Sequence, residues 1–318
     1  MPFSLARFLA TAVMALLCGA ALSAPLVDHH QHLFSPEIVA RSPGLASLSA
    51  RDLVALLDSA GIERALVLST AYQLGNPNKP VIADEYARVR SENDWTSRQV
   101  GLFPGRLRGF CGFNPLKEYA IAEVERCAGD PRMRFGIKLH FGNSDVDLTD
   151  PTQVEQLVKV FKAAANRNMA VAVHMRPSVT RNRPYGAAQA RIFLNELIGA
   201  APGTVIQIAH LAGAGGYDDP SIDEALSVFV EAVERDDPRM AHLYFDVSGV
   251  AGVGDWRSKA SLVARRIRQL GVQRVLYGSD GAVGGGMTPA QGGKAFRELP
   301  LTEREFREIE SNVAPYMR

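Results

Sequence analysis

Phe135-Gly136-Ile137-Lys138-Leu139-His140 is a short apolar run that ends in a histidine, and the same arrangement returns four more times along the chain. The later runs end in His174, His210, Asp246 and Asp280. The successive polar ends are 34, 36, 36 and 34 residues apart. A strand, a helix and two loops of a parallel βαβ unit take about 30 or more residues. The spacing therefore predicts that strand after strand delivers a polar side chain to one end of a parallel sheet.

Eight apolar segments alternate with helical patterns, as in a parallel α/β fold. We expect strands at 26–34, 64–70, 107–113, 133–141, 170–174, 205–210, 243–247 and 274–279. A doubly wound open sheet binds its ligand at one switch point, whereas polar ends recur here on at least five strands. A (β/α)₈ barrel brings them together and needs about 250 residues. The sequence thus predicts one α/β domain, a (β/α)₈ TIM barrel over residues 25–318.

The first 24 residues resemble a secretory signal peptide. Arg7 gives a positive start, residues 8–22 are almost wholly apolar, and small residues follow at Ser23 and Ala24. The alternative, an uncleaved anchor, is less favoured because the apolar run is shorter than the ~20 residues that span a bilayer. We expect cleavage after Ser23 or Ala24 and a periplasmic or secreted protein.

Composition limits the partners. The formal net charge is +1 among 318 residues, which gives no basis for binding nucleic acid. No stable membrane association is expected after leader cleavage. We expect a small-molecule substrate, and a homo-oligomer is compatible with the sequence. Cys111 and Cys127 are expected to be separate buried thiols, although an oxidising compartment would permit a disulfide.

The segment Val27-Asp28-His29-His30-Gln31-His32 opens the series with a His-x-His pair. His30 and His32 share one face of a strand, the inward face if Val27 and His29 pack outward against helices. Imidazole and carboxylate are ligands that zinc prefers, with one position left open in catalytic sites. His30, His32, His174 and Asp280 could hold one divalent ion, which we expect to be zinc, and such an ion would activate water. His210 would then move a proton or polarise the substrate, and Asp280 would also accept a proton from the attacking water.

These pieces resemble the amidohydrolase superfamily, and in particular its amidohydrolase-related branch of decarboxylases, lactonases and hydrolases. The matching segments are Val27 to His32, Gly136-Ile137-Lys138-Leu139-His140, Val173-His174, Ala209-His210 and Tyr277-Gly278-Ser279-Asp280. The resemblance implies a metal bound by His30, His32, His174 and Asp280, with His210 catalytic or a second ligand.

Three further residues are candidates for substrate binding or a second metal. Some superfamily members use a carboxylated lysine on strand four to bridge two metals, and Lys138 stands at that place; alternatively it pairs with an acid such as Asp280 or Asp246. His140 is expected to contact substrate. Arg176, two residues after His174, could bind a substrate carboxylate in a bidentate way.

The predicted function is a metal-dependent hydrolase of a small organic substrate, with an amide, lactone or ester bond as the target. The first alternative is a metal-dependent decarboxylase of the same branch, and another is a metal-independent lactonase. A non-catalytic binding protein is the least favoured, because no ligand of the set is missing.

Overall fold

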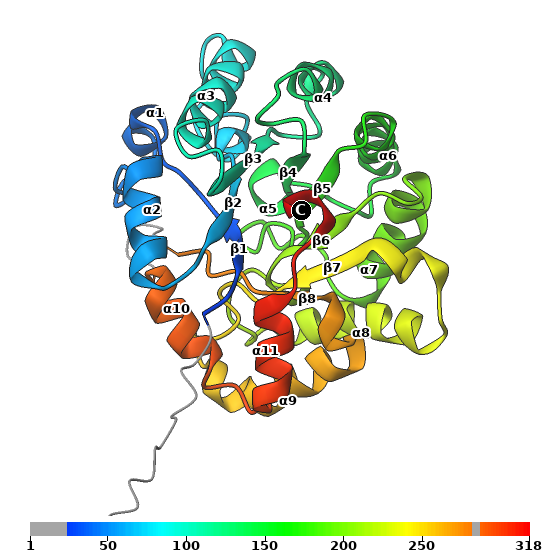
Figure 1. The fold of residues 1–318 in the computed structure, drawn as a ribbon. Coiled ribbons are helices and arrows are strands. Elements are labelled where there is room, and N and C mark those ends of the chain that lie inside the picture. The colour runs from blue at the N-terminus through cyan, green and yellow to red at the C-terminus, as the bar shows by residue number, and fades with distance from the viewer. Residues whose placement is uncertain (1–23, 282–286) are drawn as a thin grey trace, which may run out of the picture.

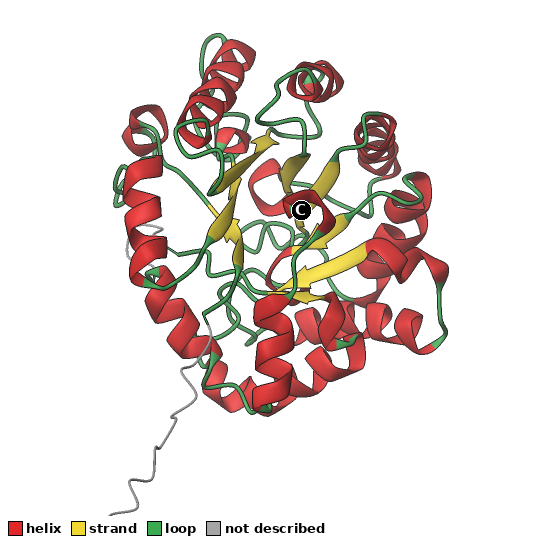
Figure 2. Cartoon of the chain, viewed as in Figure 1, coloured by secondary structure: helices red, strands yellow, loops and turns green. Residues whose placement is uncertain are grey.

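The computed structural model describes residues 24–281 and 287–318 as one ring of strands surrounded by helices (Figures 1 and 2). The expected leader lies outside the described residues except for Ala24. Among the described residues, no helix is both long and apolar enough to cross a membrane.

The sheet has eight strands, each parallel to and paired with the next along the chain. The strands are β1 Val27–Gln31, β2 Arg64–Leu68, β3 Leu107–Gly112, β4 Gly136–His140, β5 Ala170–His174, β6 Ile206–Ile208, β7 Leu243–Asp246 and β8 Val275–Leu276. The predicted single-domain (β/α)₈ barrel is therefore confirmed. Several strands are shorter than the sequence suggested, and β6 stops two residues before His210.

The seam between the last and the first strand is closed just beyond β8. His29 N donates to Tyr277 O at 2.9 Å, and Asp280 N donates to His30 O at 2.9 Å. The buried Asp28 carboxylate adds two bonds, from Ser279 N at 3.0 Å and Ser279 Oγ at 2.6 Å. Closure at this seam is what places Asp280 beside the histidines of β1.

An irregularity in β1 overturns the expectation that Val27 and His29 face the helices. Asp28 pairs with Ala65 of β2 but Gln31 pairs with Val67, so β1 carries a bulge between Asp28 and Gln31. A bulge inserts an extra residue and reverses the alternation of side chains. Val27 and His29 therefore point into the barrel below the bulge, and His30 and His32 point into it above.

Helices cover the outside of the ring, except for α5, a single turn that directly follows β4 within it (Figure 1). They are α1 Pro36–Ala40, α2 Ala50–Ser59, α3 Glu85–Val100, α4 Ala120–Ala128, α5 Phe141–Ser144, α6 Pro151–Asn166, α7 Ala187–Ile192, α8 Pro220–Glu234, α9 Trp256–Leu270, α10 Pro289–Phe296 and α11 Glu303–Ser311. A π-helical turn, Phe193–Ile198, continues α7. Proline at the first turn and a capping aspartate start both α6 (Asp150) and α8 (Asp219), because proline lacks the N–H that would be unsatisfied there.

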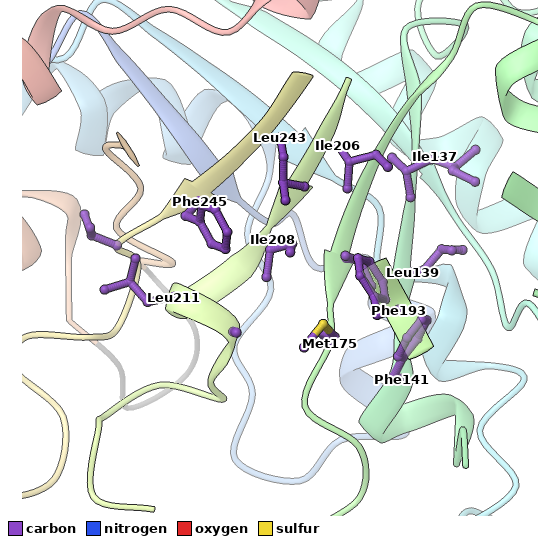
Figure 3. Packing of buried hydrophobic residues seen from close by; sticks show 14 of the residues in the cluster. Ile137, Leu139, Phe141, Met175, Phe193, Ile206, Ile208, Leu211, Leu243 and Phe245 are labelled. Atoms are coloured by element: carbon purple, nitrogen blue, oxygen red, sulfur yellow. The ribbon is translucent and has the colours of Figure 1, made fainter. Parts of the chain in front are cut away.

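The main core fills the space between the strands and these helices. Outward-facing Ile137 and Leu139 of β4 and Ile208 of β6 are fully buried there in the same cluster as Phe193, as Figure 3 shows. The intervening residues of β4, Lys138 and His140, point into the barrel instead. Alternation along each strand thus separates core side chains from site side chains.

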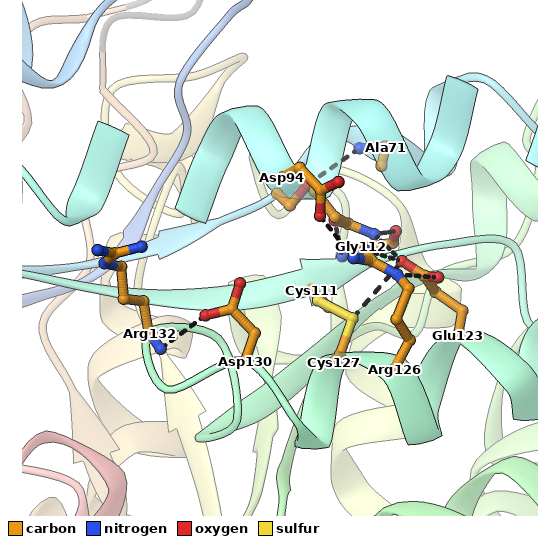
Figure 4. Close-up of a disulfide and its surroundings, with 11 residues drawn as sticks. Ala71, Asp94, Cys111, Gly112, Glu123, Arg126, Cys127, Asp130 and Arg132 are labelled. Atoms are coloured by element: carbon orange, nitrogen blue, oxygen red, sulfur yellow. Dashed lines mark hydrogen bonds and ion pairs between the residues drawn. A yellow bond between two sulfur atoms is a disulfide. The ribbon is translucent and has the colours of Figure 1, made fainter. Parts of the chain in front are cut away.

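A disulfide joins β3 to α4, contrary to the expectation of two free thiols (Figure 4). The Sγ atoms of Cys111 and Cys127 are 2.00 Å apart, with Cα atoms at 6.3 Å. Cys111 points outward from β3, and Cys127 lies in the last turn of α4, beside that strand. The two cysteines are 16 residues apart, and the βα unit itself brings them into bonding distance.

Candidate metal centre and active site

The predicted site residues meet at the carboxyl ends of the strands. They surround a cavity of roughly 200 Å³. Its lining consists of His30, His32, Phe34, Thr70, Tyr72, Gln73, Lys138, His140, His174, His210, Ala214 and Asp280. All the predicted site residues except Arg176 are in this lining, which is the usual location of active sites in barrel enzymes.

Three of these side chains form a cluster with metal-ligand geometry: His30, His32 and Asp280. Asp280 Oδ1 lies 3.8 Å from His30 Nε2 and 3.5 Å from His32 Nε2. Two ligands that each lie 2.0–2.2 Å from one ion are roughly 3–3.6 Å apart. Asp280 Oδ1 is buried and has no hydrogen-bond partner among the described residues. A buried carboxylate oxygen without a partner is costly, and a divalent cation would supply one. These residues therefore fit a divalent metal ion.

Hydrogen bonds to the other ring nitrogen prepare both histidines as ligands. His32 Nδ1 donates to Leu68 O at 2.6 Å, and His30 Nδ1 donates to Asp246 Oδ2 at 3.0 Å. Each Nε2 consequently carries a lone pair, as a metal ligand must. Burial lowers the pKa of His32 to about 3, so this ring is neutral at neutral pH.

Asp246 is the centre of a buried network behind these ligands. Its Oδ1 accepts from His210 N at 3.0 Å and from Ser248 Oγ at 2.5 Å. Burial alone would raise the pKa of Asp246, but His30, His210 and the hydrogen bonds outweigh burial and hold it far below its usual value. Asp246 is thus an ionised carboxylate that orients His30. The sequence identified Asp246 as a strand end but assigned it no role in the site, and it gave no signal for Ser248.

His210 presents a free nitrogen to the cavity. Its Nδ1 donates to Ser248 O at 2.7 Å, which leaves Nε2 unprotonated in the neutral ring. Burial, and then the neighbouring His30, lower the pKa of His210. The ring is therefore a proton acceptor at neutral pH.

His210 and Asp280 also share an unusual backbone conformation. Both lie in the left-handed region, with φ of 55° and 50°. Leu211 and Ala212 continue this conformation at 48° and 66°. Such residues cost free energy and concentrate at functional sites.

Lys138 is a buried cation next to the ligand cluster. Its Nζ lies 3.5 Å from His30 Nε2, and its side chain is 1% exposed. Burial lowers its pKa to about 8, because the charged form loses solvation. The charges of Asp246 and Asp280 act in the opposite direction and favour the ammonium form, although neither carboxylate forms an ion pair with Lys138 among the described residues.

His140 and His174 form the opposite wall. Their rings stack at 3.9 Å, on neighbouring strands where the two residues are paired. His140 Nδ1 accepts from Asn143 N at 3.1 Å, so its Nε2 carries the proton in the neutral ring and can donate to a bound molecule. His174 Nδ1 and Nε2 bond to no other described residue. His174 was predicted as a ligand and lines the same cavity, but it is not within the tight His30–His32–Asp280 cluster.

Arg176 pairs with protein rather than lining the cavity. Its Nε and Nη2 donate to Asp219 Oδ2 at 3.1 and 2.9 Å, and its guanidinium lies 4.8 Å from the centre of the Tyr185 ring. Its Nη1 is buried without a partner among the described residues. The proposed contact with a substrate carboxylate remains a prediction for this residue.

Solved structures similar to this chain share its barrel. One is 5-carboxyvanillate decarboxylase from Sphingomonas paucimobilis, at a TM-score of 0.64 and 18% identity, covering 93% of this chain and 99% of that one. Another is 2,6-dihydroxybenzoate decarboxylase from Rhizobium, at 0.62 and 15%, covering 91% and 96%. A third is a probable 2-pyrone-4,6-dicarboxylic acid hydrolase from Acinetobacter baumannii, at 0.61 and 16%, covering 91% and 96%. At these identities the likeness shows the fold alone.

The sequence itself matches none of the curated proteins with which it was compared. The sequence profile of the family described as amidohydrolase matches residues 27–312. This match spans every strand of the barrel and all residues of the cavity lining, and the chain therefore belongs to the amidohydrolase family.

Proposed function

We propose that this enzyme is a metal-dependent decarboxylase of a small aromatic carboxylic acid. The observation that carries the proposal is the His30–His32–Asp280 cluster, which opens onto a small cavity beside the buried Lys138. Phe34 and Tyr72 add aromatic surface to this cavity. Two of the similar solved structures are named as decarboxylases of 5-carboxyvanillate and of 2,6-dihydroxybenzoate, which are hydroxylated aromatic acids. This favours a lyase over the hydrolase that the sequence suggested.

The ligand cluster would hold the metal, which would draw electron density from the substrate oxygen atoms when bound. The similar decarboxylase from Polaromonas is described with manganese bound, whereas the sequence pointed to zinc. We propose that the site binds one divalent ion, and metal analysis of the purified protein distinguishes manganese from zinc. Lys138 stands at the place of a bridging lysine, so two equivalents of metal would implicate it as a carboxylated ligand.

The remaining side chains have complementary roles toward an aromatic acid. The Lys138 ammonium would pair with the substrate carboxylate. His140 Nε2–H would donate to a substrate oxygen, and His210 Nε2 would accept from a ring hydroxyl. The aromatic ring would lie against Tyr72, which is itself buried.

The reaction breaks the bond between the ring carbon and the carboxylate carbon. Carbon dioxide leaves, the electron pair stays on the ring carbon, and that carbon then takes up one proton. Lys138, with a pKa of about 8, is protonated at neutral pH and is the acid that we assign to this step.

Hydrolysis is the second candidate. It is favoured by His210, whose unprotonated Nε2 could accept a proton from an attacking water molecule. The similar Acinetobacter protein is named as a probable hydrolase of a pyrone dicarboxylic acid. A lactone or ester would occupy the same cavity, so the two reactions must be separated by their products.

The test begins with the metal content of protein purified without chelator. The protein is then stripped with a chelator and assayed against hydroxylated benzoates and against lactones, with Mn²⁺ or Zn²⁺ restored. Release of CO₂ that disappears on stripping and returns with the metal supports the proposal. Addition of water without CO₂ release would establish the hydrolase, and full activity in stripped protein would point to a metal-independent lactonase.

We further propose that the mature enzyme works outside the cytoplasm. The leader pattern suggests export, and the Cys111–Cys127 disulfide supports it, because disulfides persist in oxidising compartments.

A further inference from the structure

The C-terminal segment enters the barrel from the end opposite the cavity. Ala314, Tyr316 and Met317 are buried among inward-facing residues of the strands, including Phe110 and Leu276. Figure 1 shows this segment in dark red over the middle of the ring of strands. The amino ends of the strands are therefore closed by the last residues of the chain.

A continuous set of hydrogen bonds leads from this segment to the ligand cluster. Tyr316 Oη donates to Gln207 Oε1. Gln207 Nε2 donates to Asp246 Oδ2 at 2.6 Å, and the same oxygen accepts from His30 Nδ1 at 3.0 Å. All four side chains are at most 7% exposed, so water does not compete for these bonds.

We propose that Tyr316 is a positioning residue for the metal site, acting through Gln207 and Asp246 on His30. This inference rests on the metal site of the proposed function. The Tyr316 hydroxyl holds the oxygen of the Gln207 amide away from Asp246. The NH₂ group of the amide is thereby directed at the carboxylate, which in turn keeps the proton of His30 on Nδ1 and leaves its Nε2 unprotonated, as binding of the ion requires.

The hydroxyl keeps its proton, and can donate it, above the pH at which an exposed tyrosine would ionise. Burial raises the pKa of Tyr316 well above its ordinary value. The ring itself packs edge-on against Phe110 at 5.0 Å between centroids. A Tyr316→Phe variant therefore removes the hydrogen bond and keeps the packing.

A second hydrogen bond of the Gln207 amide limits the loss of metal affinity that we expect from removing the Tyr316 hydroxyl. Gln207 Nε2 also donates to His29 O at 3.0 Å, so part of its orientation survives the loss of the hydroxyl. Partners that orient a metal ligand typically change metal affinity 10–100-fold. Two side chains, Gln207 and Asp246, stand between Tyr316 and His30 in this series of hydrogen bonds. We therefore expect a change in metal affinity at the lower end of that range, about tenfold.

The test is calorimetric titration of chelator-stripped protein with Mn²⁺. Tyr316→Phe should weaken binding about tenfold. Tyr244→Phe is the matched control, since Tyr244 packs against the same cluster and lies outside this set of hydrogen bonds; it should bind like wild type. In an Asp246→Asn background, Tyr316→Phe should cause no additional loss, because the link to His30 is already broken.

The outcomes separate this inference from the proposed function. Wild-type protein that binds no divalent ion would overturn the metal-dependent function and this inference with it. Unchanged affinity in Tyr316→Phe, or an equal loss with and without Asp246→Asn, would overturn this inference and leave the metal site standing. Should Tyr316→Phe not fold, Gln207→Met cuts the same link at similar volume and must show the same dependence on Asp246.

Discussion

His210 and Asp280 hold left-handed backbone conformations that residues other than glycine rarely adopt, at a cost of about 1–3 kcal/mol each. Hydrogen bonds from the surrounding structure compensate for this cost. His210 is fixed from three sides, by Asp246, by Ser248 and by Gly213 N, which donates to its carbonyl oxygen at 2.9 Å. In a regular extension of β6 the His210 side chain would point outward like those of Ile206 and Ile208; with the left-handed turn it lines the cavity instead.

The role of His210 can be separated from metal binding by a single substitution. His210→Asn should lower kcat by about 10²–10⁴-fold, the usual cost of losing a positioned acid–base group, while metal content stays near the wild-type value. Steady-state kinetics and metal analysis on the same preparation measure both quantities.

The exposed His242, in the turn before β7, provides the control, and His242→Asn should behave like wild type. Asp280→Asn should lose metal as well as activity, because its Oδ1 belongs to the ligand cluster. Loss of metal in His210→Asn would reassign this histidine as a ligand, with His140 the next candidate for proton transfer.

At the scale of elements, β1 and the turn after β8 build the site together. The β1 bulge sends His29 into the barrel interior, where its Nδ1 donates to Tyr277 O at 3.0 Å and its Nε2 accepts from Ala314 N at 3.3 Å. Gly278 allows the close approach at this seam, since a Cβ there would lie 2.9 Å from the His30 Cβ. Hydrogen bonds therefore join β1, which carries His30 and His32, both to the turn after β8, which carries Asp280, and to the C-terminal segment.

The disulfide between β3 and α4 should contribute measurably to stability. A cross-link closing a loop of about 15 residues is worth about 3 kcal/mol in the chain-entropy account. The double variant Cys111→Ala/Cys127→Ala should therefore lower the free energy of unfolding by roughly 2–3 kcal/mol, as measured by urea denaturation.

Thiol titration of denatured, unreduced protein gives an independent check of this bond. Neither cysteine should react before reduction, and both should react after it. Two reactive thiols before reduction would restore the picture of separate buried cysteines.

Helix α3 carries a buried carboxyl whose ionisation opposes folding. Glu92 is 2% exposed; its Oε2 accepts from Ser35 Oγ at 2.5 Å, and its Oε1 has no partner among the described residues. Burial raises its pKa from 4.5 to about 7. The folded state therefore binds this proton more tightly than the unfolded chain does, so its contribution to stability is present below pH 4.5 and is lost as pH rises through about 7.

Glu92→Gln should remove this pH dependence. The free energy of unfolding of the variant minus that of wild type should be larger at pH 8 than at pH 5, by on the order of 1–3 kcal/mol. Urea denaturation at the two pH values measures the difference, and Glu118→Gln at an exposed position is the control. A constant offset between Glu92→Gln and wild type at both pH values would show that Glu92 does not titrate in this range.

For the molecule as a whole, the two ends of the barrel have different tasks. The carboxyl ends of the strands carry the cavity and its ligands, and the amino ends are closed by Ala314, Tyr316 and Met317. A truncation of the last few residues would therefore open the barrel interior rather than trim a free tail.

The export proposal concerns the whole chain and is tested by its N-terminus. Protein recovered from a periplasmic or secreted fraction should begin at Ala24 or Pro25, because small residues precede these positions. N-terminal sequencing measures this directly. Met1 retained on soluble cytoplasmic protein would refute the proposal and leave the disulfide without an oxidising compartment to explain it.

Much of the site was predictable because a closed parallel barrel places the carboxyl ends of all its strands at one rim. An apolar run followed by a polar residue, repeated every 34 to 36 residues, therefore predicts that His140, His174, His210 and Asp280 reach one rim, whereas the left-handed turns at His210 and Asp280 were not predictable from this pattern. Alternation along a strand predicted that His30 and His32 share one face of β1, but the bulge in β1 decided that this face is the inner one. These are local patterns, and through them the sequence by itself determined the fold and seven of the residues that line the cavity. The other lining residues carried no such signal; they are Phe34, Thr70, Tyr72, Gln73 and Ala214.

Other features depended on contacts between distant parts of the chain, and only the tertiary structure decided them. The inward turn of His29 follows from a bulge that the pairing of β1 with β2 imposes. The pairing of Cys111 with Cys127 depends on how α4 lies on β3. Tyr316 and Gln207 are 109 residues apart, and nothing local to either relates them. The sequence determined which side chains arrive at the rim, because strand direction is local, whereas their tautomers, partners and closeness to one another depend on packing between segments far apart in the chain.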